Sequence, residues 1–261
     1  MRPRRDITRR LPVALVASGA AVLALAAPSA ASTECRAGHG SVDVVGKPGP
    51  VVAWRAALSS RVPTHARVPG RKKTRRARTA GRAVSPRDAP WLLVLRAKND
   101  RKGRCWVRVR LPWRPNEAGA WVRAQHVNLR PTRWRIRVNL AERSLVLRRG
   151  KRPVLRTSVV IGAPITPTPQ GLFSIVGVWR WNPADFLGSY ILPLTAHSPV
   201  LQEFGGGDGR VGIHGRGGES LLAPLGSMAS HGCIRLPNGA IESVVRRVGA
   251  GGLPGIPVRV R

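Results

Sequence analysis

The sequence predicts a mainly β protein with one short helix. Apolar and polar residues alternate over 134–140 and again over 105–111. Such alternation is typical of strands that bury one face. A helix is expected only at 240–248, where Asn238 can cap the first turn and Gly249 can end the last one.

Further strands are expected in the C-terminal half, where short apolar runs are separated by glycine, proline and polar residues. These strands are 145–147, 154–161, 172–181, 190–194 and 256–260. Gly150 lies in a hairpin turn between the first two of them. Pro257 cannot donate to a strand ladder, so it confines the last strand to a sheet edge or to a strand start.

A smaller β domain is expected at 86–131. Its three short strands, 91–95, 105–111 and 120–124, are separated by Asn-Asp, Pro-Asn and Gly turns. Their spacing resembles a small SH3-like β-barrel. An N-terminal extension packed on the following domain is the alternative. Its tryptophans are expected in the core in preference to a sugar-stacking surface.

Residues 1–31 have the features of a secretory signal peptide. A basic stretch, 1–10, precedes an apolar run, 11–27, and small residues follow. Ser29 and Ala31 suit the −3 and −1 positions, so we expect cleavage near Ala31 and export to the cell envelope, the periplasm or the cell wall. An uncleaved anchor is the alternative, because about 17 apolar residues can just span a membrane.

Charge is the most unusual feature of the composition. The 261 residues include 45 Lys and Arg against 12 Asp and Glu, a formal net charge of +33. Such a field indicates anionic surroundings, and charge alone does not choose among nucleic acid, membrane and wall polymers. Export argues against nucleic acid. Residues 32–85, with a basic run at 71–82, are expected to form a low-complexity linker, which can also act as an electrostatic tether to anionic cell-wall polymers. Short strands at 42–45 and 51–54 are the alternative within this segment.

One stretch, 211–236, carries the candidate chemistry. It holds His214-Gly215 and then Ser230-His231-Gly232-Cys233. A cysteine near histidines can be held as a thiolate beside an imidazolium, the usual way to make a sulfur nucleophile. A small buried cysteine is the alternative, but an unpaired thiol in an exported chain calls for a reason.

These motifs resemble the signature of the YkuD-type L,D-transpeptidases, cysteine enzymes that remodel bacterial peptidoglycan. The likeness rests on His214-Gly215, on the run Ser230 to Leu236, and on the threonine-proline stretch 166–175. It extends from about Trp134 to the C-terminus. It implies a YkuD-like β-sandwich catalytic domain at 132–261.

The resemblance also implies roles for the site residues. Cys233 is the expected nucleophile and His214 the general base, whose ring the Gly215 carbonyl orients. His231 is expected to shape the cysteine loop or to polarise the substrate. Spacing alone does not rank the two histidines.

The remaining site residues surround the nucleophile. The N–H groups of Gly232 and Cys233 can form an oxyanion hole, and Ser230 can hydrogen-bond within the loop. Arg235 can bind a carboxylate of the substrate or one of the fold. Residues 179–186 are expected either to flank the substrate groove as a lid or to pack Trp179 and Trp181 into the core.

The expected function is peptidoglycan L,D-transpeptidation, which forms 3→3 cross-links between donor and acceptor stem peptides through a cysteine acyl-enzyme. The alternatives are an L,D-carboxypeptidase and a non-catalytic, basic wall-binding protein. We expect a monomer that binds no nucleic acid. No cofactor or metal is expected, because structural zinc sites take four protein ligands and His197 is the only candidate for a fourth beside His214, His231 and Cys233.

Two cysteines remain outside the candidate site. In an exported chain Cys35 and Cys105 can form a disulfide that ties the N-terminal segment to the small β domain. Two free thiols are the alternative.

Overall fold

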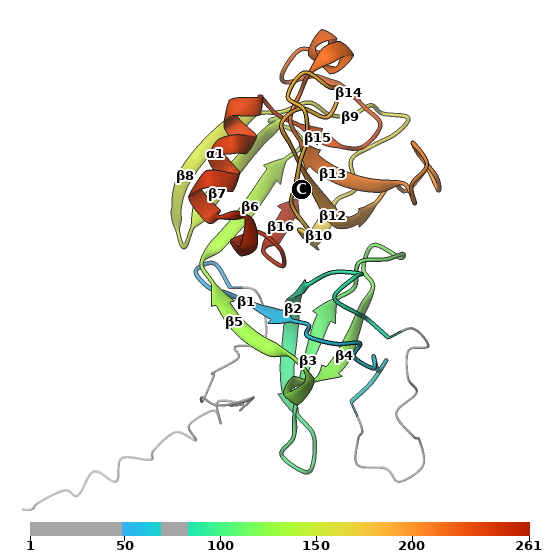
Figure 1. Cartoon of the computed structure of the whole chain (residues 1–261), viewed down its shortest axis with the longest axis vertical. Helices are drawn as coiled ribbons and strands as arrows, with labels where there is room; N and C mark the ends of the chain where they lie inside the picture. Colours follow the sequence, from blue (N-terminus) through green and yellow to red (C-terminus); the bar gives the residue numbers. More distant parts are fainter. Residues whose placement is uncertain (1–48, 69–82) are drawn as a thin grey trace, which may run out of the picture. The chain divides into compact units, whose positions relative to one another are not determined.

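The computed structural model describes residues 49–68 and 83–261, whose strands and helix are drawn in Figure 1. The expected signal peptide 1–31, Cys35 and the basic run 71–82 lie outside the described residues. Within the described ranges, no helix is long and apolar enough to cross a membrane.

An N-terminal β unit is built on one five-stranded antiparallel sheet with the strand order β4-β3-β2-β1-β5. Its strands are β1 (Ala53–Ala57), β2 (Trp91–Asn99), β3 (Cys105–Arg110), β4 (Gly119–Arg123) and β5 (Asn128–Thr132). A short 3₁₀ turn, Ala124–His126, joins β4 to β5. The unit has its own apolar core, which includes Leu92, Val107 and Val122.

The three strands expected in this unit are present as β2, β3 and β4, but the linker expected at 32–85 is wrong for β1. That strand pairs with β2 on one side and β5 on the other, and Ala53 and Ala56 are buried. Trp106 and Trp121 are buried, as a core role requires. Cys105 is disulfide-bonded. The SH3-like character of the unit and the identity of Cys35 as the disulfide partner stay predictions.

The C-terminal half begins with a five-stranded sheet in the order β10-β16-β6-β7-β8. Its strands are β6 (Trp134–Asn139), β7 (Ser144–Arg149), β8 (Arg152–Ser158), β10 (Gly171–Ser174) and β16 (Pro257–Val260). Only β16 and β6 run parallel within it. Because β16 lies between β10 and β6, Pro257 stands at a strand start and not at a sheet edge.

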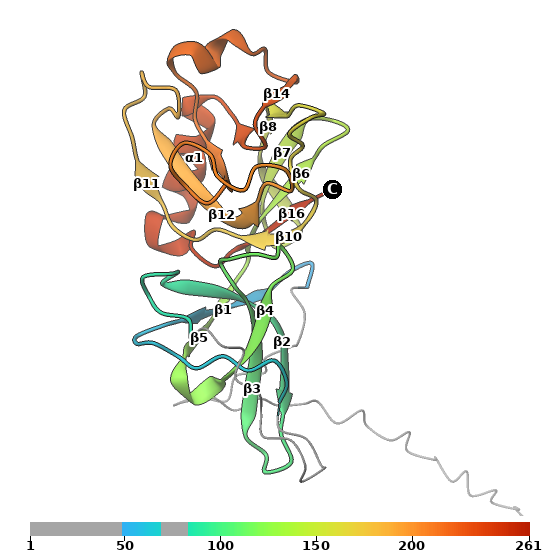
Figure 2. The same cartoon turned by 90° about the vertical axis from the view of Figure 1, so that its right-hand side faces the viewer.

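A second sheet faces the first across the main core, in the order β11-β12-β13-β15 (Figure 2). Its strands are β11 (Trp179–Arg180), β12 (Tyr190–His197), β13 (Arg210–His214) and β15 (Ile234–Arg235). A separate pair consists of β9 (Ile161–Gly162) and β14 (Met228–Ser230). The core between the sheets contains Ile136, Val258 and Leu192. The chain is thus mainly β, as expected.

The one α-helix among the described residues, α1, spans Asn238–Val248 and packs Ile241 and Val244 into the same core. It begins two residues before the expected start, and Pro237 is its N-cap. The Asn238 side chain does not cap the helix, contrary to the expectation. Gly249 ends the helix with a φ of +80°, a conformation that favours glycine.

Candidate active site

Parallel pairing of β13 with β15 brings the two central residues of the site together. His214 ends β13, and Cys233 stands immediately before β15. In this ladder Ile213 lies opposite Ile234 and His214 opposite Arg235. A histidine and a cysteine 19 positions apart in the chain therefore come from adjacent strands. The ladder fixes their separation, because a shift of one residue would turn a side chain to the other face.

The imidazole of His214 is buried, with 1% of its surface exposed. Its Nδ1 lies 2.8 Å from the carbonyl oxygen of Gly215, the contact expected from the sequence. In the neutral ring Nδ1 therefore carries the proton, and Nε2 is the basic nitrogen. Gly215 itself has no room for a side chain, since a Cβ would lie 2.1 Å from Oδ1 of Asn238.

Cys233 is half-buried and has a free thiol. Burial raises its pKa above the ordinary value, whereas a hydrogen bond from the Gly212 backbone and the charge of Arg235 act in the opposite direction. Burial also lowers the pKa of His214 from 6.5 to about 4; hydrogen bonds to the backbone of Gly215 and Leu187 raise it, and Arg235 lowers it further.

These shifts differ from the thiolate and imidazolium that the sequence led us to expect. Removal from water disfavours the charged form of both groups, so the resting pair is a thiol and a neutral imidazole. The contacts of the described residues include no hydrogen bond between Cys233 and His214. Catalytic hydrogen bonds are often long or poorly aligned before substrate binds.

The loop before Cys233 is closed by the buried hydroxyl of Ser230. Its Oγ donates to the Cys233 carbonyl oxygen at 2.6 Å and accepts from the Gly232 N–H at 3.1 Å. Ser230 thus bonds within the loop, as expected. The Gly232 N–H, one of the two expected oxyanion donors, thus has an acceptor within the loop, and the oxyanion role of Gly232 and Cys233 stays a prediction. Gly232 adopts a φ of +114°, which favours glycine.

Two buried threonines hold this loop from the other side. Thr166 Oγ1 donates to the Ser230 carbonyl at 3.1 Å, and Thr168 Oγ1 donates to the Gly232 carbonyl at 2.9 Å. Thr168 Oγ1 also accepts from the Gly162 N–H at 2.8 Å. In the sequence this threonine-proline stretch counted only toward the family resemblance; in the structure it positions the cysteine loop.

Residues 133–260 match the family of L,D-transpeptidase catalytic domains called YkuD. These residues belong to the YkuD family. No curated protein matches the chain.

Solved structures of L,D-transpeptidases are similar to this one. The catalytic domain of the Enterococcus faecium enzyme has 22% identity and a TM-score of 0.36, with 49% of this chain and 96% of that chain covered. L,D-transpeptidase 3 from Mycobacterium tuberculosis, solved with a faropenem-derived adduct, has 14% identity and a TM-score of 0.39, with 60% and 91% covered. A longer mutant Enterococcus faecium chain has 23% identity and a TM-score of 0.34, and this chain spans only 49% of it.

Arg235 of this YkuD domain is buried, and its guanidinium lies 4.6 Å from the ring centroid of Phe186. Its Nε is buried without a hydrogen-bond partner. Among the residues that the structure describes, no carboxylate forms an ion pair with Arg235. The described part of the chain therefore does not supply the carboxylate that one of the two sequence-based alternatives required.

The segment 179–186 lies beside the site and not in the core. Trp179 and Trp181 have 51% and 49% of their surface exposed, so the core-packing alternative is wrong. Phe186 is exposed too, and its ring centroid lies 6.5 Å from that of His214. A groove of about 560 Å³ lies next to the segment 179–186, and its lining includes Pro183, Leu221 and Asn238.

Asn238 has a role that sequence reasoning missed. Its Oδ1 accepts from the N–H groups of Ser189 and Arg216, both at 3.0 Å, and its Nδ2 donates to the Pro183 carbonyl. One amide thus ties the 179–186 segment to the backbone that follows His214. The sequence drew attention to Asn238 only as a helix cap, and its place at the start of α1, three residues after Arg235, gives no sign of these contacts.

His231 is exposed and its ring packs on Phe204, with centroids 4.9 Å apart. Phe204 belongs to loop 198–209, which the N-terminal β unit anchors. Arg114 donates to the carbonyls of Ser198, Leu201 and Asp208 at 2.8, 2.9 and 3.2 Å. His231 therefore connects the cysteine loop to a loop held by another part of the chain.

Within the described ranges, no group of three or more His, Cys, Asp and Glu side chains is placed as metal ligands would be.

Proposed function

We propose that this protein is a peptidoglycan L,D-transpeptidase that forms 3→3 cross-links through an acyl-enzyme on Cys233. The observation that carries the proposal is the parallel β13–β15 pairing within a YkuD domain, because it joins the strand that ends at the buried, neutral imidazole of His214 to the strand that follows the free thiol of Cys233. The catalytic role of both residues is part of the proposal.

In the first step Cys233 Sγ attacks the carbonyl carbon of the third residue of a donor stem. The thiol proton passes to Nε2 of His214, which is neutral at pH 7 because its pKa is about 4. The positive charge of Arg235 favours the developing thiolate. The Cys233 N–H can stabilise the oxyanion of the tetrahedral intermediate.

Collapse of that intermediate breaks the bond to the terminal D-alanine. The imidazolium of His214 returns its proton to the departing amine, and a thioester remains on Cys233. In the second step the side-chain amine of another stem attacks the thioester, and the cross-link forms as the thiol is released. Water in place of the amine would make the protein an L,D-carboxypeptidase.

Substrate binding is assigned to the charged and exposed side chains around the thiol. A buried guanidinium without a carboxylate partner favours a stem carboxylate as the ligand of Arg235. The exposed segment 179–186 supports a flanking wall for the stem, with Phe186 over that guanidinium. We further propose that the chain is exported to the cell envelope by residues 1–31 and acts as a monomer.

The test uses the full chain with a disaccharide-tetrapeptide and a second stem as the acceptor. Products are separated and identified by mass spectrometry, with a Cys233→Ala variant in parallel. A cross-linked dimer with stoichiometric D-alanine supports transpeptidation, and a tripeptide with D-alanine supports the carboxypeptidase. If folded protein releases no D-alanine from several stem types, the proposed enzymatic activity is refuted. The alternative of a non-catalytic, basic wall-binding protein then remains.

A further inference from the structure

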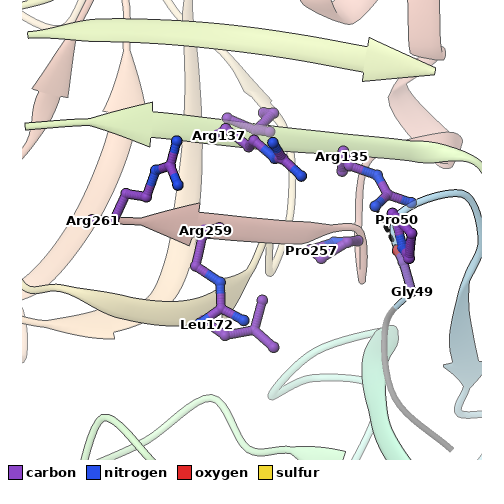
Figure 3. Close-up of a pocket in the computed structure, with 9 residues that line it drawn as sticks. Gly49, Pro50, Arg135, Arg137, Leu172, Pro257, Arg259 and Arg261 are labelled. Atoms are coloured by element: carbon purple, nitrogen blue, oxygen red, sulfur yellow. Dashed lines mark hydrogen bonds between the residues drawn. The ribbon is translucent and has the colours of Figure 1, made fainter. Parts of the chain in front are cut away.

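A second pocket lies on the β10-β16-β6-β7-β8 sheet, where side chains of β6 and β16 line it (Figure 3). Its volume is about 490 Å³. Four arginines line it, together with small and apolar residues. The lining consists of Arg135, Ile136, Arg137, Leu172, Pro257, Arg259, Arg261, Gly49 and Pro50.

Strand register explains why these arginines share one face. In the parallel pair of β6 and β16, Arg137 lies opposite Arg259, and Ile136 lies opposite Val258. The apolar partners point into the main core, so the alternate residues point outward. Arginines two positions apart on a strand are separated by about 7 Å. The result is a small lattice of positive charges.

Arg135 forms the buried part of this lattice. Only 7% of its surface is exposed, and its Nη1 donates to the Gly49 carbonyl. Its Nε and Nη2 are buried with no hydrogen-bond partner. Burial lowers the pKa of Arg135, and the nearby charges of Arg137 and Arg148 lower it further. Buried donors without acceptors and uncompensated like charges both cost free energy.

No anionic side chain in the described ranges offsets that cost. The ion pairs found there involve Asp100, Glu142 and Asp208, none of which contacts the four pocket arginines. Exposed arginines alone are ordinary solvated residues in so basic a chain. A nine-tenths buried guanidinium with two free nitrogens, at the edge of a concave site, is not.

We propose that this pocket binds the phosphate groups of a phosphodiester-linked polyol polymer. Guanidinium groups bind phosphate oxygens in pairs, and a repeating polyanion can meet several arginines of the lattice in turn. Leu172, Pro257 and Pro50 offer apolar contacts for a polyol backbone. No aromatic side chain lines the pocket, so it lacks the stacking platform that single-stranded nucleic acids use.

The proposal is independent of the proposed catalysis. The lattice lies on the far side of its sheet from the core that separates that sheet from β13 and β15. The pocket would hold the enzyme on an anionic polymer while Cys233 acts on stems. In this proposal the pocket arginines, which are part of the large positive charge of the chain, form a defined binding surface.

The test measures binding of a fluorescently labelled glycerol-phosphate oligomer to the full chain by anisotropy, over a series of salt concentrations. The Arg137→Gln/Arg259→Gln double variant removes two exposed pocket charges. Its affinity should fall at least about 10-fold, and its log–log salt slope should decrease by about 1.4, roughly 0.7 for each lost phosphate contact. D-alanine release from a soluble stem should be unchanged.

The matched control is Arg101→Gln/Arg130→Gln, which removes the same charge from exposed positions of the N-terminal β unit. Its affinity should change less than about 2-fold. Equal losses in the two double variants would overturn the proposal and leave only the general field of the protein. A thymidine oligonucleotide of equal phosphate number should bind less tightly. Tighter binding of that oligonucleotide, lost in the pocket variant, would make a nucleic acid the occupant and overturn the polyol polymer.

Arg135→Met sharpens the result, because it removes the buried charge and keeps the volume of the stem. Binding should fall at least about 10-fold while the melting temperature stays the same or rises, as expected when an uncompensated buried charge is replaced by an apolar group. A lower melting temperature with intact binding would show that Arg135 serves the fold alone and would contradict the proposal.

Discussion

The cysteine loop and the loop that packs against it are held in different ways. The cysteine loop 230–233 is held by buried hydrogen bonds from Thr166, Thr168 and Ser230, all within the YkuD domain. Loop 198–209 is held in part by Arg114, from the N-terminal β unit, and it contacts the cysteine loop through Phe204 and His231. The first support belongs to the family motif, and the second depends on a distant part of this chain.

The contacts that hold the two loops differ in burial, and burial determines how much free energy their loss costs. A buried hydroxyl or imidazole that loses its partners keeps the full cost of its removal from water, whereas a partly exposed arginine regains water when its bonds break. Changes in the buried support should therefore affect stability and activity together. Changes in the loop 198–209 should affect activity alone and by less.

The largest expected effect concerns His214 and acid. Its folded pKa of about 4 lies below the ordinary 6.5, so between these pH values the unfolded chain binds the proton and the folded one does not. Stability should therefore rise with pH across this window, and about 3 kcal/mol should be lost as pH falls from 7 to below 4. Urea unfolding at several pH values measures this loss.

The comparison for that experiment is a His214→Gln variant, whose unfolding free energy should fall less steeply with acid by about the same 3 kcal/mol. His197 and His65, whose pKa values burial also lowers, give both proteins a remaining slope of the same sign. The exposed His126→Gln variant is the matched control. Parallel pH curves for wild type and His214→Gln would show that the imidazole is not buried in its neutral form.

The next effect concerns Thr168. A Thr168→Val variant removes the acceptor of the Gly162 N–H and the donor to the Gly232 carbonyl. Two unsatisfied buried groups should lower stability by roughly 2–4 kcal/mol and D-alanine release by at least about 30-fold. Melting curves and the rate of Cys233 alkylation report the two effects. Thr157→Val, a hydroxyl near solvent, is the control; wild-type alkylation of Thr168→Val would mean that the loop keeps its position without this bond.

The smallest effect concerns Arg114. An Arg114→Ala variant frees three carbonyls of loop 198–209. These groups can be solvated, so we expect about a 3- to 5-fold lower kcat/KM and faster proteolysis within the loop, with little change in melting temperature. Arg101→Ala, in an exposed turn of the same unit, should leave both rates at the wild-type value. Unchanged proteolysis of Arg114→Ala would show that the N-terminal unit does not support the site.

Local patterns in the sequence predicted most of the strands and the helix. The alternation at 134–140 and 105–111 corresponds to β6 and β3, and the helix predicted at 240–248 corresponds to α1. β1 overlaps the short strand considered at 51–54, but its segment was interpreted as a linker because a charge run follows it, and its burial comes from β2 and β5 far along the chain. The expected strand 172–181 is two short strands, β10 and β11, in different sheets.

The residues of the site could be found from the sequence, but their states could not. The motif placed His214, Ser230 and Cys233 in one stretch, and the structure gathers them through β13 and β15. The charge states depend on burial, which spacing does not encode. The hydrogen bond that occupies the Gly232 N–H depends on the rotamer of Ser230. The contacts of Asn238 and Arg114 join segments about 50 and 84 or more positions apart.

The central claim is that Cys233 forms a covalent acyl-enzyme, and intact mass spectrometry tests it most directly. The full chain and its Cys233→Ala variant would be mixed with a disaccharide-tetrapeptide and quenched in acid. We predict a wild-type adduct equal to the stem without its terminal D-alanine, and none on the variant. An adduct of the same mass on the variant, or D-alanine release by folded wild type without any adduct on rapid quenching, would contradict the account.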